Sequence, residues 1–226
     1  MRSEVLVFDV NETLLDLEAL TPLFVRVFAD RQAMRQWFAE LILYSQTLTL
    51  CGDYLPFGKL AVEVLHMVAR IRGLSLTAGD ITEFRDRMAA LPAHQDALPA
   101  LEKLSAAGFR MVTLTNSSAQ AGQQTLAQSG LAHFFEKQFS VEEVSRFKPA
   151  AENYANVAHA LGKEPGSLRL IAAHSWDILG AMACGWKGAL VARPGNAVLE
   201  IGPQPDVVEK DLLAAAQRII TIEDAG

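Results

Sequence analysis

The chain opens on an apolar run that ends at a carboxylate. Val5–Phe8 contains only apolar residues, and Asp9 ends the run. The polar residues Asn11, Glu12 and Thr13 follow directly. An apolar run of this length with turn residues behind it predicts a strand that is buried on both faces of a parallel sheet. Ligands bind at the carboxyl edge of such a sheet, so Asp9 is predicted to lie at a functional edge.

The pattern between Asp9 and Ala93 is helical. Apolar residues recur there at spacings of three and four, and glycines interrupt the pattern at positions 52, 73 and 79. Four helices are predicted, over Glu18–Asp30, Gln32–Leu50, Phe57–Arg72 and Asp80–Met88. We interpret this stretch as a helical insert.

From Asp96 onward, short apolar runs alternate with helical patterns. The predicted helices are 96–107, 118–129, 150–161, 176–184 and 210–219, and the predicted strands are 110–114, 138–140, 168–172, 188–191 and 206–208. Such alternation is typical of a parallel sheet covered on both faces. The prediction is an α/β fold with a doubly wound, Rossmann-like core over residues 1–15 and 94–226. A helical cap over residues 16–93 is inserted after the first strand.

Composition narrows the class of protein. Half of the 226 residues are apolar and a fifth are charged, which is typical of a globular chain, and no window resembles a membrane span. The net charge of -6 argues against a nucleic-acid partner. The start of the chain lacks a cleavable apolar leader, so we expect a cytoplasmic protein. Cys51 and Cys184 show no metal or redox spacing and are predicted to be reduced and buried.

Polar residues stand at four predicted strand ends. These are Asp9 with its polar neighbours, the segment 115–118 (Thr-Asn-Ser-Ser), Lys148, and the segment 174–177 (His-Ser-Trp-Asp). Each has an ordinary explanation when it is taken alone. A carboxylate or hydroxyl can cap a helix, a lysine can be solvated, and an acid in a first helical turn complements the helix dipole. The four together, in this order, favour an active site.

The string VFDVNETLLD resembles the nucleophile loop of the haloacid dehalogenase superfamily, and the four strand ends match that superfamily's set in order. The resemblance implies that Asp9 attacks carbon or phosphorus of a substrate. Phosphatases of the superfamily use an acid two residues after the nucleophile and hold Mg²⁺ with further acids. Here that position is Asn11, which is a poor proton donor, and the fourth strand end offers only Asp177. We therefore predict no metal and no cofactor.

Similarity to the 2-haloacid dehalogenases extends over nearly the whole chain. It rests on the spacing of Asp9 and Thr13, on the segments LTNSS, FKPAAENY and HSWDILGA, and on the RPGN turn at 193–196. The resemblance implies hydrolysis of short (S)-2-haloalkanoic acids to (R)-2-hydroxyalkanoic acids through an ester on Asp9. It also implies a homodimer, which the apolar stretch Leu41–Leu50 supports.

The resemblance assigns roles to further residues. Lys148 would keep the nucleophile ionised, and Asp177 would brace the lysine. Thr13 and Tyr154 would orient these groups. The substrate carboxylate would be held by Thr115, Asn116 and nearby backbone N–H groups, and the predicted binding residues also include Val10, Asn11, Tyr154 and Trp176.

Two features depart from the common pattern of that family. Phe38 aligns where most members carry an arginine that binds the departing halide. Glu12 and His174 stand where glycine and asparagine are common. A minority of the family resembles this chain and uses a His/Glu pair to activate water, so we interpret Glu12 and His174 as such a pair. The alternative is that Glu12 is a surface acid in a turn.

Four cap residues are predicted to line an apolar pocket. They are Phe38, Ile42, Tyr54 and Phe57, although the same residues could form the cap's own core. An apolar pocket suits a short haloalkanoate and excludes water. Two other functions stay open at this point, a Mg²⁺-dependent small-molecule phosphatase and a non-catalytic binding protein on the same fold.

Overall fold

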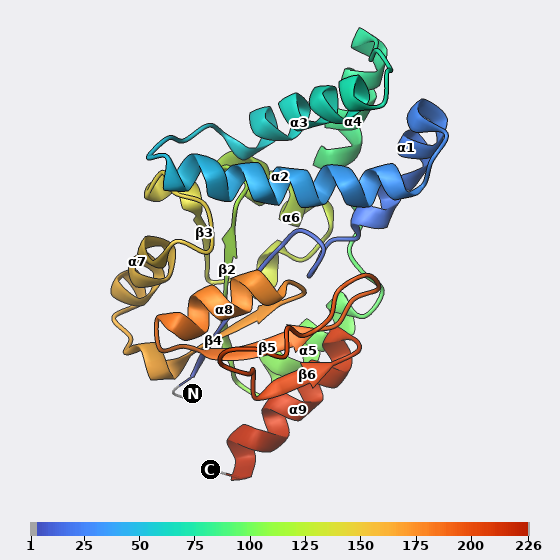
Figure 1. Ribbon diagram of the computed structural model, residues 1–226. Helices are drawn as coiled ribbons and strands as arrows, with labels where there is room; N and C mark the ends of the chain where they lie inside the picture. The colour runs from blue at the N-terminus through green and yellow to red at the C-terminus, as the bar shows by residue number, and fades with distance from the viewer. Residues whose placement is uncertain (1–3, 226) are drawn as a thin grey trace.

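A computed structural model describes residues 4–225, and its centre is a six-stranded parallel sheet (Figure 1). The strands lie in the order β3-β2-β1-β4-β5-β6, so β1 is central and pairs with β2 and β4. Their bounds are β1 Val5–Phe8, β2 Arg110–Thr115, β3 Lys137–Ser140, β4 Leu168–Ala172, β5 Lys187–Val191 and β6 Val207–Glu209. This order and direction confirm the predicted doubly wound α/β fold.

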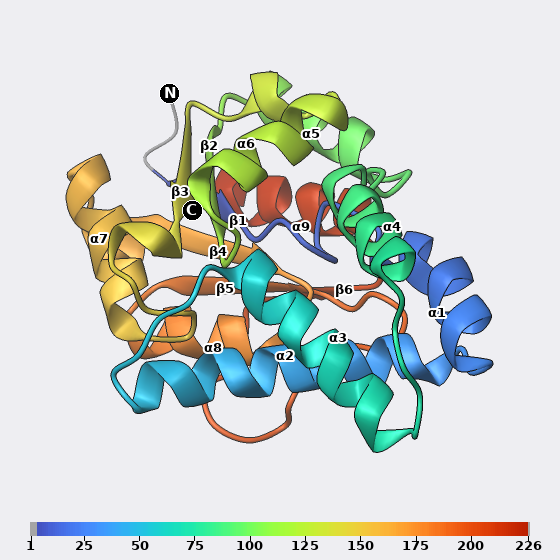
Figure 2. The same cartoon turned by 90° about the horizontal axis from the view of Figure 1, so that it is seen from above.

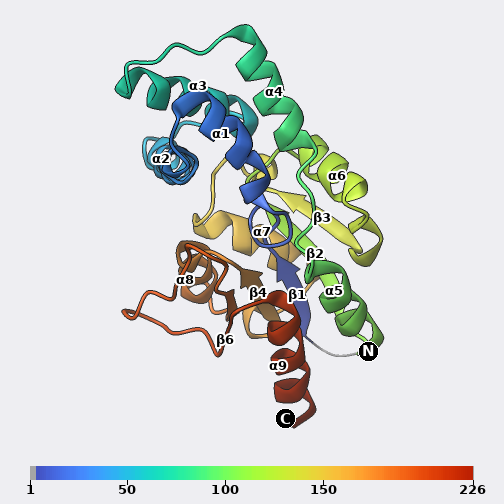
Figure 3. The ribbon, with the colours of Figure 1, turned by 90° about the vertical axis from the view of Figure 1, so that its right-hand side faces the viewer.

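Helices cover both faces of the sheet (Figure 3). On one face lie α5 (Ala97–Ala106), α6 (Ala119–Gln128) and α9 (Leu212–Ala225), and on the other lie α7 (Ala151–Leu161) and α8 (Ser175–Ala183). Side chains of β1 alternate between the two layers: Leu6 and Phe8 pack in the cluster that includes α5 and α9, whereas Val5 and Val7 pack with α7 and α8. Burial on both faces is the reason why the strand is apolar at every position.

The segment after β1 forms a helical layer above the carboxyl edge of the sheet (Figures 1 and 2). It consists of the 3-10 helix η1 (Leu17–Leu20) and the helices α1 (Thr21–Phe28), α2 (Gln32–Leu50), α3 (Phe57–Ile71) and α4 (Ala78–Ala89). Further 3-10 turns in the rest of the chain are η2 (Ala132–Phe134), η3 (Val141–Glu143) and η4 (Pro165–Ser167).

Two of the predicted cap helices have different bounds. The predicted helix over 18–30 is wrong as a single element, because η1 precedes α1 and Pro22 stands in the first turn of α1. Proline lacks the N–H that a continuous helix would need at this point. The last cap helix begins at Ala78 because Thr77 and Asp80 form a reciprocal capping box around its first turn.

Backbone hydrogen bonds join the chain near residues 14–16 to the chain near residues 92–94. Asp16 donates its backbone N–H to Pro92 at 2.8 Å, and His94 donates to Leu14 at 2.9 Å, so the outgoing and returning chains run side by side. The division into a core over 1–15 and 94–226 and a cap over 16–93 stays a prediction. Residues 1–3 and 226 of the predicted core lie outside the described residues.

Three minor predictions concern the surface. The predicted burial of both cysteines is wrong. Cys51 is exposed because α2 ends there at a turn, and Cys184 is half-buried at the end of α8. On α2, Leu43 and Leu50 are 54% and 88% exposed while Leu41 is buried, and the homodimer stays a prediction. Within residues 4–225, the helices are too short or too polar to cross a membrane.

Candidate active site

A carboxylate, a lysine and a second carboxylate meet at the carboxyl edge of the sheet. Asp9 follows β1, Lys148 precedes α7, and Asp177 lies in the first turn of α8. The Lys148 Nζ atom donates to Asp9 Oδ1 at 2.8 Å and to Asp177 Oδ2 at 2.6 Å. It also donates to the carbonyl oxygen of Leu114 at 3.0 Å, so all three of its protons have acceptors.

This triad is fully buried, and its charges depend on one another. Lys148 and Asp177 are 0% exposed. Burial by itself would raise the pKa of Asp9, but the charges of Lys148 and His174 outweigh that effect and hold it well below its usual range. Burial would lower the pKa of Lys148, and the two carboxylates raise it instead. Asp9 is therefore an ionised carboxylate at neutral pH.

The loop after β1 holds the Asp9 carboxylate in a defined orientation. Thr13 donates its hydroxyl to Asp9 Oδ2 at 2.7 Å and accepts the backbone N–H of Ala173 at 2.9 Å. Arg193 donates to the carbonyl oxygen of Thr13 at 2.8 Å and to Asp96 at 2.7 Å. Each Asp9 oxygen thus has a hydrogen-bond donor from a different part of the chain.

Glu12 and His174 are in direct contact. His174 Nε2 lies 2.7 Å from Glu12 Oε2, and His174 Nδ1 lies 3.4 Å from Asp9 Oδ2. Both side chains are buried, so Glu12 is not the surface acid of the alternative interpretation. Burial would lower the pKa of His174, but the hydrogen bonds and charges of Asp9 and Glu12 raise it to about 9.

Glu12 adopts a backbone conformation that few residues favour. Its φ is 66°, in the left-handed region, which costs of order 1 kcal/mol for a residue that is not glycine. Burial would raise the pKa of its carboxyl group, but His174 and Arg35 lower it to about 2. The Glu12 side chain is thus an ionised carboxylate on a strained backbone.

A small cavity of about 10 Å³ opens onto Asp9. The cap contributes Phe38, Ile42 and Phe57 to its wall. The core contributes the predicted binding residues Asn11, Thr115, Asn116 and Trp176, and His174, which was predicted as catalytic. The imidazole of His174 stacks on Trp176, with ring centres 5.1 Å apart, and lies 5.5 Å from the ring of Phe38. The walls are mostly apolar around one carboxylate.

Three residues predicted to bind substrate lie elsewhere. Tyr154 is buried behind the triad, where it donates to Asp177 Oδ1 at 2.6 Å. Tyr54 packs on Phe147 with ring centres 5.1 Å apart, because the chain turns away between α2 and α3. Val10 is buried under the loop, where its carbonyl oxygen accepts from Leu14 and Leu15. None of the three contributes to the wall of the small cavity.

The turn between β2 and α6 faces the same cavity. Asn116 Oδ1 accepts the backbone N–H of Lys148 at 3.0 Å, and Thr115 Oγ1 accepts that of Ser117 at 3.1 Å. Both side chains shape the turn at the N-terminus of α6, where backbone N–H groups favour an anion. The Asn11 side chain contacts this turn as well, because its Nδ2 atom donates to the Ser117 hydroxyl at 3.3 Å.

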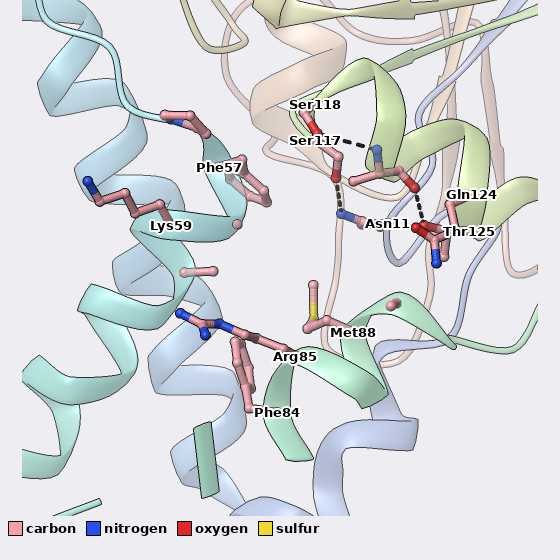
Figure 4. Close-up of a pocket in the computed structure, with 15 residues that line it drawn as sticks. Asn11, Phe57, Lys59, Phe84, Arg85, Met88, Ser117, Ser118, Gln124 and Thr125 are labelled. Carbon is pink, nitrogen blue, oxygen red and sulfur yellow. Dashed lines mark hydrogen bonds between the residues drawn. The ribbon is translucent and has the colours of Figure 1, made fainter. Parts of the chain in front are cut away.

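A second, larger space adjoins the first. It has a volume of about 240 Å³ between α3, α4 and α6, and Asn11 and Phe57 line both spaces. Figure 4 shows the ring of Phe57 on one side, Met88 and Arg85 on α4 on another, and the hydrogen bond from Asn11 to Ser117 opposite them. The cavity beside Asp9 therefore adjoins a second space between the cap and the core.

Two arginines near the site were not predicted as functional residues. Arg35 on α2 contacts Glu12, and Arg193 anchors the Thr13 loop. The RPGN turn marked Arg193 as part of a motif, but the sequence pattern did not indicate that it would contact the carbonyl oxygen of Thr13. Arg35 stands on the amphipathic helix three residues before Phe38, and its contact spans 23 positions of the sequence.

The charge arrangement also bears on metal binding. Among residues 4–225, no group of three or more His, Cys, Asp and Glu side chains is arranged to hold a metal ion. The ammonium group of Lys148 already bridges Asp9 and Asp177, so a cation that used these carboxylates would have to displace it.

Comparisons with known proteins agree with this geometry. The family model of the haloacid dehalogenase-like hydrolases, which describes their shared sequence pattern, matches residues 4–185. The chain is 26% identical to (S)-2-haloacid dehalogenase 2 of Pseudomonas sp. (strain CBS-3) over 89% of both chains. It is 29% identical to (S)-2-haloacid dehalogenase 4A of Burkholderia cepacia over 84% of this chain and 83% of that protein.

A solved structure extends the likeness to three dimensions. A dehalogenase crystal structure with an intermediate complex superposes with a TM-score of 0.89 at 25% identity, covering 98% of both chains. The match to the family model spans most of the chain, and the sheet order and the strand-end carboxylates fit it. The chain belongs to the haloacid dehalogenase-like hydrolases.

Proposed function

We propose that the protein hydrolyses short (S)-2-haloalkanoic acids to (R)-2-hydroxyalkanoic acids without a metal ion. One observation carries the proposal: an ionised Asp9, oriented by Lys148 and Thr13, faces a small cavity that the cap closes with apolar side chains. A carboxylate in such surroundings is a competent nucleophile toward carbon. The (S)-2-haloacid dehalogenases among its relatives support the same reaction.

In the first step, an Asp9 oxygen attacks C2 of the substrate and an ester bond forms. The carbon–halogen bond breaks, the halide leaves with the bonding electron pair, and the carbon inverts. The turn at Thr115 and Asn116 would hold the substrate carboxylate at the N-terminus of α6. Lys148 and Thr13 keep the attacking group aligned for reaction.

The imidazole of His174 offers a positive charge for the leaving halide. Its pKa of about 9 makes it an imidazolium at neutral pH, and it lies beside Phe38, where the common family pattern has arginine. A cation next to the developing halide stabilises the transition state. We expect the rate of the chloride burst to fall as the pH rises above about 9, because the imidazolium then loses its proton. A rapid-mixing chloride assay across pH 7 to 10 checks this.

Ester formation changes the charge balance at His174. Alkylation makes Asp9 neutral, so one of the two carboxylates that hold the imidazole proton is lost and the proton leaves to solvent. The neutral imidazole then accepts a proton from water as the water attacks the carbonyl carbon of the ester. Breakdown of this intermediate releases the hydroxy acid and restores the Asp9 carboxylate beside the imidazolium. Over the cycle one water is consumed, and one halide and one proton are released.

The decisive experiment measures halide release from (S)- and (R)-2-chloropropionate with and without a metal chelator, beside an aryl phosphate with Mg²⁺. We expect chelator-resistant chloride release from the (S) enantiomer alone. Phosphate release that needs Mg²⁺, without chloride, would replace the proposal with a phosphatase. Binding of the haloacid with neither turnover nor a covalent adduct would replace it with a binding protein.

A variant tests the second step by itself. His174→Asn is expected to leave the alkyl ester on Asp9 unhydrolysed, which mass spectrometry of the intact protein detects as an added alkyl group. The ester forms more slowly than in the natural chain because the cation beside the halide is also lost. Unchanged turnover in this variant would remove His174 from the mechanism.

A further inference from the structure

Arg35 reaches from the cap into the core. It stands on α2, and its Nη1 atom pairs with Glu12 Oε1 in the loop after β1. Its Nη2 atom donates to Glu18 Oε1 at 2.9 Å and to the carbonyl oxygen of Pro194 at 3.1 Å. The guanidinium is therefore fixed by three separate parts of the chain.

The Glu12 carboxylate is shared between two partners. One oxygen pairs with Arg35, and the other lies 2.7 Å from His174 Nε2. The His174 Nδ1 atom is the ring nitrogen that faces the Asp9 carboxyl group. An arginine that holds one carboxylate oxygen leaves the other oxygen aimed at the imidazole, because the planar guanidinium restricts rotation of the carboxylate.

We propose that Arg35 is a positioning residue that orients Glu12, and through it His174, for activation of the hydrolytic water. The proposal rests on the proposed function and adds a cap residue to its second step. It also means that the water-activating pair is complete only when α2 lies against the core.

The buried charges support this role. Asp177 is balanced by Lys148, and Glu12 is balanced by Arg35, so the charge that changes during the reaction is that of Asp9, which faces His174. When Asp9 becomes an ester, nothing remains unbalanced except the imidazole proton, and that proton can leave.

Loss of the guanidinium would change this balance. Among residues 4–225, the imidazole would then be the remaining cationic partner of the Glu12 carboxylate, so the proton would stay on His174 in the ester form. Two other titratable groups lie nearby: His94, whose Nε2 lies 3.0 Å from the Glu12 carbonyl oxygen, and Glu18, which pairs with Arg35 and is anionic. Neither can supply the missing positive charge at neutral pH, because burial lowers the pKa of His94.

The test is Arg35→Met, which keeps the length of the side chain and removes its charge. In single turnovers with (S)-2-chloropropionate, we expect the chloride burst to stay within about twofold of the natural chain. Hydrolysis of the ester should slow by about tenfold at neutral pH and recover as the pH rises, with its midpoint about one unit higher, since one pKa unit corresponds to a tenfold change. Mass spectrometry of quenched samples follows the ester directly.

Arg31→Met is the matched control. Arg31 is a nearby exposed arginine that also pairs with Glu18, at 3.2 Å, and it makes no contact with Glu12 among the described residues. It should leave both steps and the pH profile unchanged. Arg35→Lys should recover part of the hydrolysis rate, because the charge returns without the planar fork.

The outcomes separate this proposal from the proposed function. If the natural chain releases chloride and Arg35→Met hydrolyses its ester with the natural rate and pH midpoint, Arg35 has no positioning role and the proposed function stands. Equal slowing of both steps in a folded Arg35→Met, or the same slowing in Arg31→Met, would mean that Arg35 only supports cap packing. Should Arg35→Met fail to fold, Arg35→Lys provides the test. If Arg35→Lys hydrolyses the ester at the rate of the natural chain and with the same pH midpoint, the proposal is overturned. If the natural chain forms no ester at all, the proposed function itself fails.

Discussion

Two clusters of buried charge lie at opposite ends of the sheet. At the carboxyl end, Asp9, Lys148 and Asp177 face the small cavity. At the amino end, Arg169 on β4 is 0% exposed and donates to Glu4 at 2.7 Å. It also pairs with Asp206, and Glu223 lies 3.6 Å away.

The two clusters share their chemistry and differ in what they leave available. The guanidinium of Arg169 pairs with carboxylates that lie on or beside other strands and on α9, so the cluster links elements of the fold. The ammonium group of Lys148 likewise donates all three of its protons in hydrogen bonds, but the Asp9 carboxylate that accepts one of them also lines a cavity. A buried ion pair is weak evidence for function until one of its groups is exposed to a ligand.

The largest expected effect is on activity at the carboxyl end. Asp9→Asn removes the nucleophile and keeps the size of the side chain, so chloride release should fall by about 10⁴-fold or more. Thermal unfolding should show a folded protein, because Lys148 retains Asp177 as its partner. Residual activity within tenfold of the natural chain would show that Asp9 is not the nucleophile.

The next effect is on stability at the amino end. Arg169→Met leaves Glu4 buried with Lys187 as its remaining cation, and breaking a buried pair in this way costs about 3–5 kcal/mol. Urea unfolding should show that loss, while the kcat of the folded fraction stays unchanged. A large fall in kcat with natural stability would contradict the distinction between the two ends.

The pH dependence of stability sharpens the comparison. The pKa of His174 is about 9 in the folded chain and about 6.5 when unfolded, so its contribution is fully present below about pH 6.5 and is lost as pH rises through 9. That contribution is roughly 3 kcal/mol, from 1.36 kcal/mol per pKa unit. Urea unfolding between pH 6 and 9.5 should show the decline, and His174→Asn should flatten it. Arg169 does not titrate in this range, so Arg169→Met should keep the slope.

The smallest effect concerns an exposed pair. Arg110 pairs with Glu136 at 2.6 Å, but both side chains are about a third exposed. Arg110→Ala should change the free energy of unfolding by less than about 1 kcal/mol, because solvent and salt screen such pairs. A loss as large as that of Arg169→Met would show that burial is not what distinguishes the charge clusters.

The pattern along the chain predicted most of the fold. Val5–Phe8 is apolar at every position because β1 is buried on both faces, and that signal is local. The strand over 168–172 was predicted with the bounds that the structure has. The helix over 18–30 was wrong because its break depends on Pro22 and on the packing of η1.

The site was predictable where a strand end marked it. Asp9 and His174 follow strands, Lys148 stands just before α7, and Asp177 lies in the first turn of α8; the sheet brings all four together. Tyr54 packs on Phe147 outside the cavity wall, because the direction of an aromatic side chain depends on its packing partners. Tyr154 lies behind the triad on Asp177, where it can orient that carboxylate but does not line the cavity.

The sequence by itself determined the order of strands and helices, the insertion of a helical segment after the first strand, and the side chains that stand at each strand end. These follow from periodicity and turn chemistry, which act over a few residues. Only the tertiary structure decided that Arg35 meets Glu12, that His174 lies between two carboxylates, and that the cavity is small and mostly apolar. Those contacts join residues far apart in the chain, and their electrostatics depend on burial, which only the packed cap and core create.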